Sequence, residues 1–144
     1  VKETATVEAT TTRPEETTAT EAQNGQIYLY GETHGVQSIK EKEYEIWHDY
    51  YHNQGLRHLF VEQSYFTAEY LNLWIQSDNN SIYEALYVDW AGTSAQSTIT
   101  TDFYMKIKSE CPESIFHGTD VGHNYSTTGS RYLRYLTENG QEVS

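Results

Sequence analysis

Glu32 and His34 stand between two glycines, directly after an apolar and aromatic run at residues 27–30. A carboxylate and an imidazole at this spacing can bind a metal ion, or act as a base and its orienting partner, because imidazole exchanges a proton near neutral pH. The make-up of the run predicts a short buried strand that contains Leu29 and ends at this pair. The motif alone is equally consistent with a loop whose polar side chains cap the next helix.

Two further strands are predicted to end in ionisable side chains. Residues 56–62 form a short apolar run with Glu62 at its end, and residues 114–117 run into a glycine-rich stretch that holds Asp120 and His123. Because ligands bind beyond the carboxyl ends of the strands in parallel sheets, we expect these groups to gather at one edge with the first pair. Helix caps and solvated loops are the alternative explanation for the same residues.

His34 is the strongest candidate for a catalytic role, because an imidazole can take a proton from water or bind a metal ion. Glu32 and Glu62 could orient this imidazole, hold a cation or polarise an attacking water. Asp120 and His123 are weaker binding candidates, since a glycine-rich loop can place polar side chains for turn geometry alone. One histidine with several carboxylates would suit Mn, Fe or Zn better than copper.

Three other histidines carry weaker signals. His117 lies inside the third predicted strand, where a hydrogen-bonded core histidine is a slightly better interpretation than a site residue. His48 and His52 are four residues apart, as in the HExxH pattern of metalloproteases, but an aspartate follows His48 and the pair falls on the polar side of its helix. We therefore favour a solvated helix surface over a metal site there.

Apolar side chains at helical spacing predict the helices that must position these residues. The predicted ranges are 36–54, 64–77, a short helix that ends at Leu86, 98–111 and 130–139. Gly55 and Pro112 follow two of these helices as expected stops. The order strand, helix, strand, helices, strand, helix predicts an α/β fold with a mainly parallel sheet, flanking helices and a site at the carboxyl ends of the strands.

Composition excludes several classes of protein. The net charge of -12 argues against unaided binding to nucleic acid or to an anionic membrane surface, because both need a cationic patch. No apolar run approaches the roughly 20 residues of a membrane-spanning helix. The single cysteine, Cys111, excludes an intrachain disulfide and is interpreted as a small buried side chain. The sequence patterns of serine hydrolases, P-loop proteins and dinucleotide-binding proteins are absent.

Residues 1–26 differ from the rest of the chain. They contain eight threonines, five glutamates and no aromatic residue, so they cannot bury enough apolar surface to offset the entropy of ordering. We predict a disordered linker that tethers the following domain to a surface, which favours an extracellular or cell-surface location. The sequence has neither an initiator methionine nor an apolar signal-peptide core, as expected of a mature or trimmed product.

The motif Gly31-Glu32-Thr33-His34-Gly35, followed by a long helix and a strand ending in Glu62, resembles the erythromycin esterase-like superfamily, which includes the haem-binding ChaN lipoproteins and the TIKI/TraB-type proteins. The similarity covers about residues 26 to 140. In the esterases the matching histidine is regarded as the base that activates water and the matching glutamates support it. The resemblance implies these roles for His34, Glu32 and Glu62. TIKI-type members cleave peptides with a metal, and ChaN-like members bind haem.

Enzymes of this superfamily usually continue well beyond this length and contribute a late histidine, so the resemblance implies that residues 27–144 are the amino-terminal part of such a domain, or a reduced member without activity. The leading hypothesis is a hydrolase-like domain in which water, activated by His34 with or without a divalent metal, attacks an ester or amide in a small molecule or peptide. The rival is a surface module that binds a ligand such as haem without turnover. A third possibility is a purely structural domain.

Overall fold

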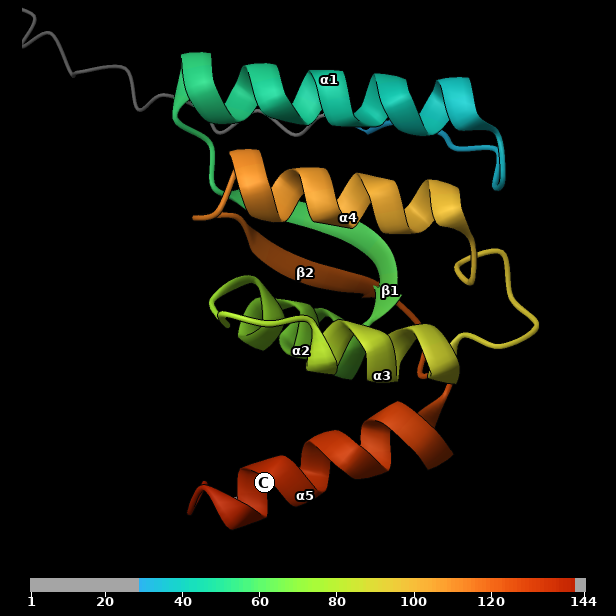
Figure 1. The fold of residues 1–144 in the computed structure, drawn as a ribbon, viewed down its shortest axis with the longest axis vertical. Coiled ribbons are helices and arrows are strands. Elements are labelled where there is room, and N and C mark those ends of the chain that lie inside the picture. Colours follow the sequence, from blue (N-terminus) through green and yellow to red (C-terminus); the bar gives the residue numbers. More distant parts are fainter. Residues whose placement is uncertain (1–28, 142–144) are drawn as a thin grey trace, which may run out of the picture. The chain divides into compact units, whose positions relative to one another are not determined.

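The computed structural model describes residues 29–141, so the predicted linker 1–26 and the first half of the predicted strand 27–30 lie outside the described residues. The elements, in order, are α1 (Gln37–Gln54), β1 (His58–Ser64), α2 (Tyr65–Ile75), α3 (Ser81–Asp89), α4 (Thr98–Glu110), β2 (Ile115–Asp120), the π-helical turn η1 (Tyr125–Gly129) and α5 (Ser130–Glu138) (Figure 1). None of these helices is long and apolar enough to cross a membrane.

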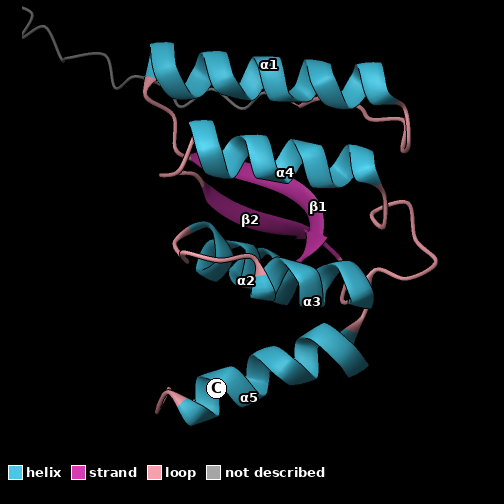
Figure 2. Cartoon of the chain, in the orientation of Figure 1, coloured by secondary structure: helices cyan, strands magenta, loops and turns pink. Residues whose placement is uncertain are grey.

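The sheet of the described chain has two strands, β1 and β2, which pair in parallel. The fold is therefore broadly α/β, as predicted, with a small parallel sheet and helices around it (Figure 2). The crossover from β1 to β2 consists of α2, α3 and α4, since parallel neighbours need a long connection.

The prediction that Leu29 lies in a buried strand is wrong. Residues 29 and 30 have no strand conformation, and Leu29 is 91% exposed. Apolar and aromatic composition favours a strand only where a neighbouring strand supplies backbone partners and a covered face, and strand propensity is correspondingly context-dependent. The chain that leads to Glu32 is thus not a strand over the part that the structure describes.

The helix predictions agree closely with the structure. The helix predicted over 36–54 is α1, and Gly55 ends it with a φ of 70° in the left-handed region, where glycine is favoured. The helix predicted over 98–111 is α4, with the Ser97 hydroxyl accepting a hydrogen bond from the backbone N–H of Thr100 at its start. Cys111 is fully buried, which confirms its interpretation as a packing residue.

The strands are shifted from their predicted positions. The strand predicted over 56–62 is β1 at residues 58–64, and the strand predicted over 114–117 extends to Asp120 in β2. Gly118 is therefore a strand residue rather than part of a loop. A Cβ atom at this position would lie 2.5 Å from the carbonyl oxygen of Ser64, so glycine permits the close approach of the two strands.

The core lies between the sheet and the helices and is largely aromatic. Trp74, Trp90 and Phe116 are almost fully buried. Tyr104 contacts the rings of both Trp90 and Phe116, which links α4 to β2 and to the end of α3. The aliphatic side chains Leu71, Leu86 and Ile107 fill the same core. This packing holds β2 against α2 and covers one face of the sheet.

Candidate catalytic site

Glu32, His34 and Glu62, the three residues predicted to form the site, lie together in the structure. The Nδ1 atom of His34 is 2.8 Å from Oε1 of Glu32, within hydrogen-bond distance. On the other side of the ring, Nε2 of His34 is 3.6 Å from Oε2 of Glu62. One imidazole is therefore placed between two carboxylates that come from distant parts of the sequence.

Local backbone geometry explains this placement. His34 is in a turn just before α1, and the next residue, Gly35, has a φ of 74°, which few other residues adopt without strain. Glu62 lies near the end of β1, with its side chain 64% exposed. A turn before the first helix and the end of a strand thus supply the two sides of the site.

Lys40 is a member of the site that sequence reasoning missed. Its Nζ atom donates hydrogen bonds to Oε2 of Glu32 at 2.7 Å and to Oε2 of Glu43 at 2.8 Å. The same ammonium group lies 4.8 Å from the centre of the Phe103 ring, so α4 also holds it in place. The spacing of Lys40 and Glu43 on a helix was the only signal in the sequence, and it points equally to an ordinary surface ion pair.

These contacts determine the charge of the site. Partial burial raises the pKa of Glu32, but the hydrogen bonds from Lys40 and His34 outweigh it and hold the pKa at about 2. The hydrogen bond to Glu32 raises the pKa of His34 above its usual 6.5. Burial raises the pKa of Glu43, which shares the ammonium group with Glu32. Glu32 is therefore ionised at neutral pH and makes His34 a stronger base.

The site is open to water. The His34 side chain is 51% exposed, whereas the side chains of Glu32 and Lys40 behind it are only 23% and 19% exposed. The imidazole is thus the accessible part of a partly covered ionic group. This arrangement suits a reaction with a water molecule or with a ligand that approaches from solvent.

The binding of a divalent metal ion by Glu32, His34 and Glu62 stays a prediction, and the present contacts of these side chains bear on it. Both ring nitrogens of His34 face carboxylates directly, and the Lys40 ammonium group already occupies the position of a cation at Glu32. Among residues 29–141, no three histidine, cysteine, aspartate or glutamate side chains are placed so that they could hold a metal ion. An ion bound to Oε2 of Glu32 would take the place that the Lys40 ammonium group has in this structure.

Asp120 and His123, the weaker candidates, pair with each other rather than with His34. The Nε2 atom of His123 is 3.4 Å from Oδ2 of Asp120, and Oδ1 of Asp120 accepts a hydrogen bond from the backbone N–H of Val121. These contacts stabilise the turn that follows β2. Asp120 and His123 therefore contact each other and the backbone of the turn, and not Glu32, His34 or Glu62, in the contacts described here.

The interpretation of His117 as a core histidine is wrong. Its side chain is half-buried on the exposed side of the sheet, where Nε2 of His117 is 2.8 Å from Nδ1 of His58. The alternation of side chains along β2 explains the error, because the neighbour Phe116, and not His117, points into the core. A site role for His117 is thus left open.

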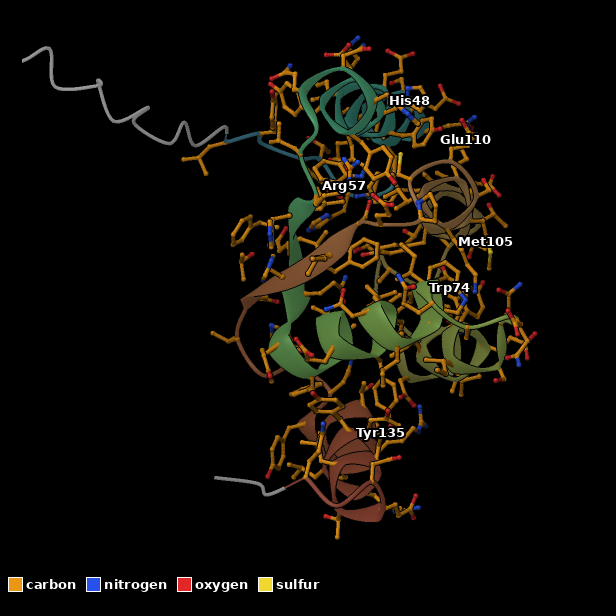
Figure 3. All side chains as sticks on the ribbon, turned by 90° about the vertical axis from the view of Figure 1, so that its left-hand side faces the viewer. His48, Arg57, Trp74, Met105, Glu110 and Tyr135 are labelled. Carbon is orange, nitrogen blue, oxygen red and sulfur yellow. The ribbon has the colours of Figure 1, made fainter. Side chains whose placement is uncertain are left out.

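His48 and His52 lie on α1 and both approach the end of α4. The Nε2 atom of His48 is 3.7 Å from Oε2 of Glu110, and the two labelled side chains face each other across the helices in Figure 3. The Nε2 group of His52 donates to the backbone carbonyl of Glu110 at 3.0 Å. This second contact satisfies a carbonyl group at the carboxyl end of α4, so the pair has a structural role.

No family model, characterised protein or solved structure matches this chain. The resemblance to the erythromycin esterase-like superfamily therefore rests on the motif around His34 and on Glu62. The roles that it implies for these residues stay predictions, and the chemistry must be argued from the geometry of the site.

Proposed function

We propose that this chain is a hydrolase-like domain in which His34 acts as a general base on a water molecule, with Glu32 and Glu62 as its supporting carboxylates. The observation that supports the proposal is the placement of one accessible imidazole between two carboxylates, one of them hydrogen-bonded. A base oriented by a second group is the recurrent arrangement of water-activating and nucleophile-activating sites.

The proposed reaction follows from the proton positions. Glu32 is a hydrogen-bond acceptor when ionised, so the neutral His34 ring carries its proton on Nδ1. The lone pair is then on Nε2, which a water molecule reaches when the exposed Glu62 side chain moves aside. Nε2 removes a proton from water as the oxygen attacks an ester or amide carbonyl. The same proton then passes from Nε2 to the departing alcohol or amine, which leaves the acid product and restores the neutral ring.

Each neighbour of His34 has a separate part in this proposal. Glu32 fixes the tautomer and stabilises the imidazolium that forms, and Lys40 keeps Glu32 ionised and in position. Glu62, on the side of Nε2, adds a second negative charge near the imidazolium. Lys40 occupies the place of a cation at Glu32, so the version of the hypothesis without a metal ion agrees better with this geometry.

The alternative is a module that binds a ligand such as haem without turnover. An exposed histidine can serve as an axial ligand of haem iron, but Nε2 of His34 would have to turn away from Glu62 to do so. Metal analysis of the purified chain and an absorption spectrum after addition of haem distinguish the two functions.

The proposal also includes the predicted tether to a surface and an extracellular or cell-surface location.

A panel of small ester and peptide substrates, assayed with the chain as it is and after treatment with a chelator, tests the hydrolase proposal. We expect turnover that survives the chelator and that falls to the background level in His34→Ala. The matched control is His48→Ala, which removes another partly exposed histidine from α1. Turnover that is equal in both variants, or a haem absorption band without turnover, would contradict the proposal.

A further inference from the structure

The exposed face of the sheet carries, besides Glu62 of the site around His34, two histidines that contact each other. Side chains alternate along β1, so His58, Phe60 and Glu62 point to one face while Leu59 and Val61 pack on the core. On β2 the same face carries His117, whose neighbour Phe116 is buried.

The register of the two strands brings two of these side chains together. His58 pairs with Ile115 and Phe60 pairs with His117, so His58 and His117 are diagonal neighbours across the parallel pair. Their rings lie 5.1 Å apart and nearly parallel, and Nδ1 of His58 is 2.8 Å from Nε2 of His117. The Phe60 ring also stacks on His117, with the ring centres 4.8 Å apart, which restricts the rotation of that imidazole.

We propose that His58 and His117 form a binding site for one divalent transition metal ion of the kind that prefers imidazole, such as Zn²⁺ or Ni²⁺. Two imidazole nitrogens that converge on one point are a pair of ligands as soon as both lack a proton. Two histidine nitrogens around a tetrahedral Zn²⁺, each about 2.0–2.1 Å from the ion, are roughly 3.3 Å apart. The observed pair therefore needs to open by only about half an ångström.

The surroundings favour a cation at this place. His58 is exposed and His117 is half-buried, so water molecules can complete the coordination. The net charge of -12 raises the local concentration of cations around the chain. A bound ion would join β1 to β2, the only strands among residues 29–141, and would thereby stabilise the folded chain.

The other histidine pair serves as an internal comparison. His48 and His52 also have neighbouring rings, 4.3 Å apart, but Nε2 of His52 is engaged with a backbone carbonyl. The carbonyl oxygen can only accept, so this nitrogen carries a proton and is not free to bind a metal ion. The two nitrogens of His58 and His117 are hydrogen-bonded to each other, so loss of the one proton between them leaves both free to bind an ion.

Isothermal titration of the full chain with Zn²⁺ at pH 7.5, together with thermal unfolding at increasing Zn²⁺ concentration, tests the proposal. We expect one ion per chain, a midpoint that rises with Zn²⁺, and reversal of this rise by a chelator. Both signals should be lost in His58→Ala and in His117→Ala. They should persist in the double variant His48→Ala/His52→Ala and in His34→Ala.

Circular dichroism establishes that each variant is folded before titration. His58→Asn is a second variant at the exposed position, since it keeps a polar side chain of smaller size and removes the imidazole. Binding that survives both His58 variants, binding that is lost with His48 and His52 or with His34, or the absence of any binding to the folded wild-type chain would overturn the proposal.

Discussion

The Nζ atom of Lys40 lies 2.7 Å from Oε2 of Glu32, and the other oxygen of the same carboxylate lies 2.8 Å from Nδ1 of His34. Lys40 therefore controls the ionisation and the position of the group that orients His34. The contact between Lys40 and Glu32 therefore tests whether the cluster has a catalytic role. Removing an ordinary surface ion pair would have little effect, whereas removing Lys40 should disturb the group that orients His34.

Lys40→Met should lower the rate of the proposed hydrolysis by about tenfold to a hundredfold, because small displacements of an orienting group are costly to catalysis. The matched control is Lys42→Met, which removes an exposed pair with Glu45 at 2.8 Å on the same helix. Rates on the most active substrate of the panel provide the measurement. Equal rates in the two variants would show that Lys40 does not position the site.

The pH dependence of turnover should reflect the raised pKa of His34. A general base acts in its neutral form, so turnover should be low below this pKa and should rise as pH passes through a value above 6.5. Glu32→Gln removes the hydrogen-bonded carboxylate that raises the pKa, so the rise should move to lower pH. A rate profile of both proteins gives the result, and a rise that does not move would exclude Glu32 as the partner of His34.

Acid unfolding should depend on Glu32. Its pKa is about 2 in the folded chain and near 4.5 without these contacts, so its contribution to stability is fully present above pH 4.5 and is lost as pH falls towards 2. Glu32→Gln should make the urea midpoint fall less steeply over this pH range. Glu45→Gln, at an exposed pair, is the control. Identical slopes for Glu32→Gln and the wild-type chain would contradict the assigned pKa.

Asp89 should be a strong stability determinant. Its side chain is only 6% exposed, and it accepts hydrogen bonds from Arg131 and from the Thr128 hydroxyl, which attach α5 and η1 to α3. Asp89→Ala leaves those donors unsatisfied and should cost about 1–3 kcal/mol of unfolding free energy. Glu113→Ala, which breaks the exposed pair with Arg57, should cost less than about 1 kcal/mol. Urea unfolding of both variants measures the difference.

Leu29 and Leu71 should respond oppositely to truncation. Leu71 is fully buried in the core, so Leu71→Ala should cost about 2–5 kcal/mol. Leu29 is 91% exposed, so Leu29→Ala should change the free energy of unfolding by no more than about 0.5 kcal/mol. Thermal and urea unfolding decide the matter. A large loss of stability in Leu29→Ala would restore the prediction of a buried strand before Glu32.

The sequence by itself determined the helices and brought Glu32, His34 and Glu62 together as one predicted group. Helical periodicity and stop residues predicted α1 and α4 almost to the residue, because Gly55 and Pro112 interrupt the helical backbone just after them. The grouping of Glu32, His34 and Glu62 was also predicted. The reason given for it was partly wrong, since the described residues before Glu32 form no strand, and a turn at Gly35 places His34 instead.

Only the tertiary structure decided the partners of these residues. The contact between His58 and His117 joins positions 59 apart, and the ion pair between Asp89 and Arg131 joins positions 42 apart. Neither leaves a periodic trace in the sequence, because such contacts depend on strand register and helix packing rather than on local backbone preference. Lys40 reaches Glu32 only because α1 begins directly after the turn and directs the ammonium group back toward it.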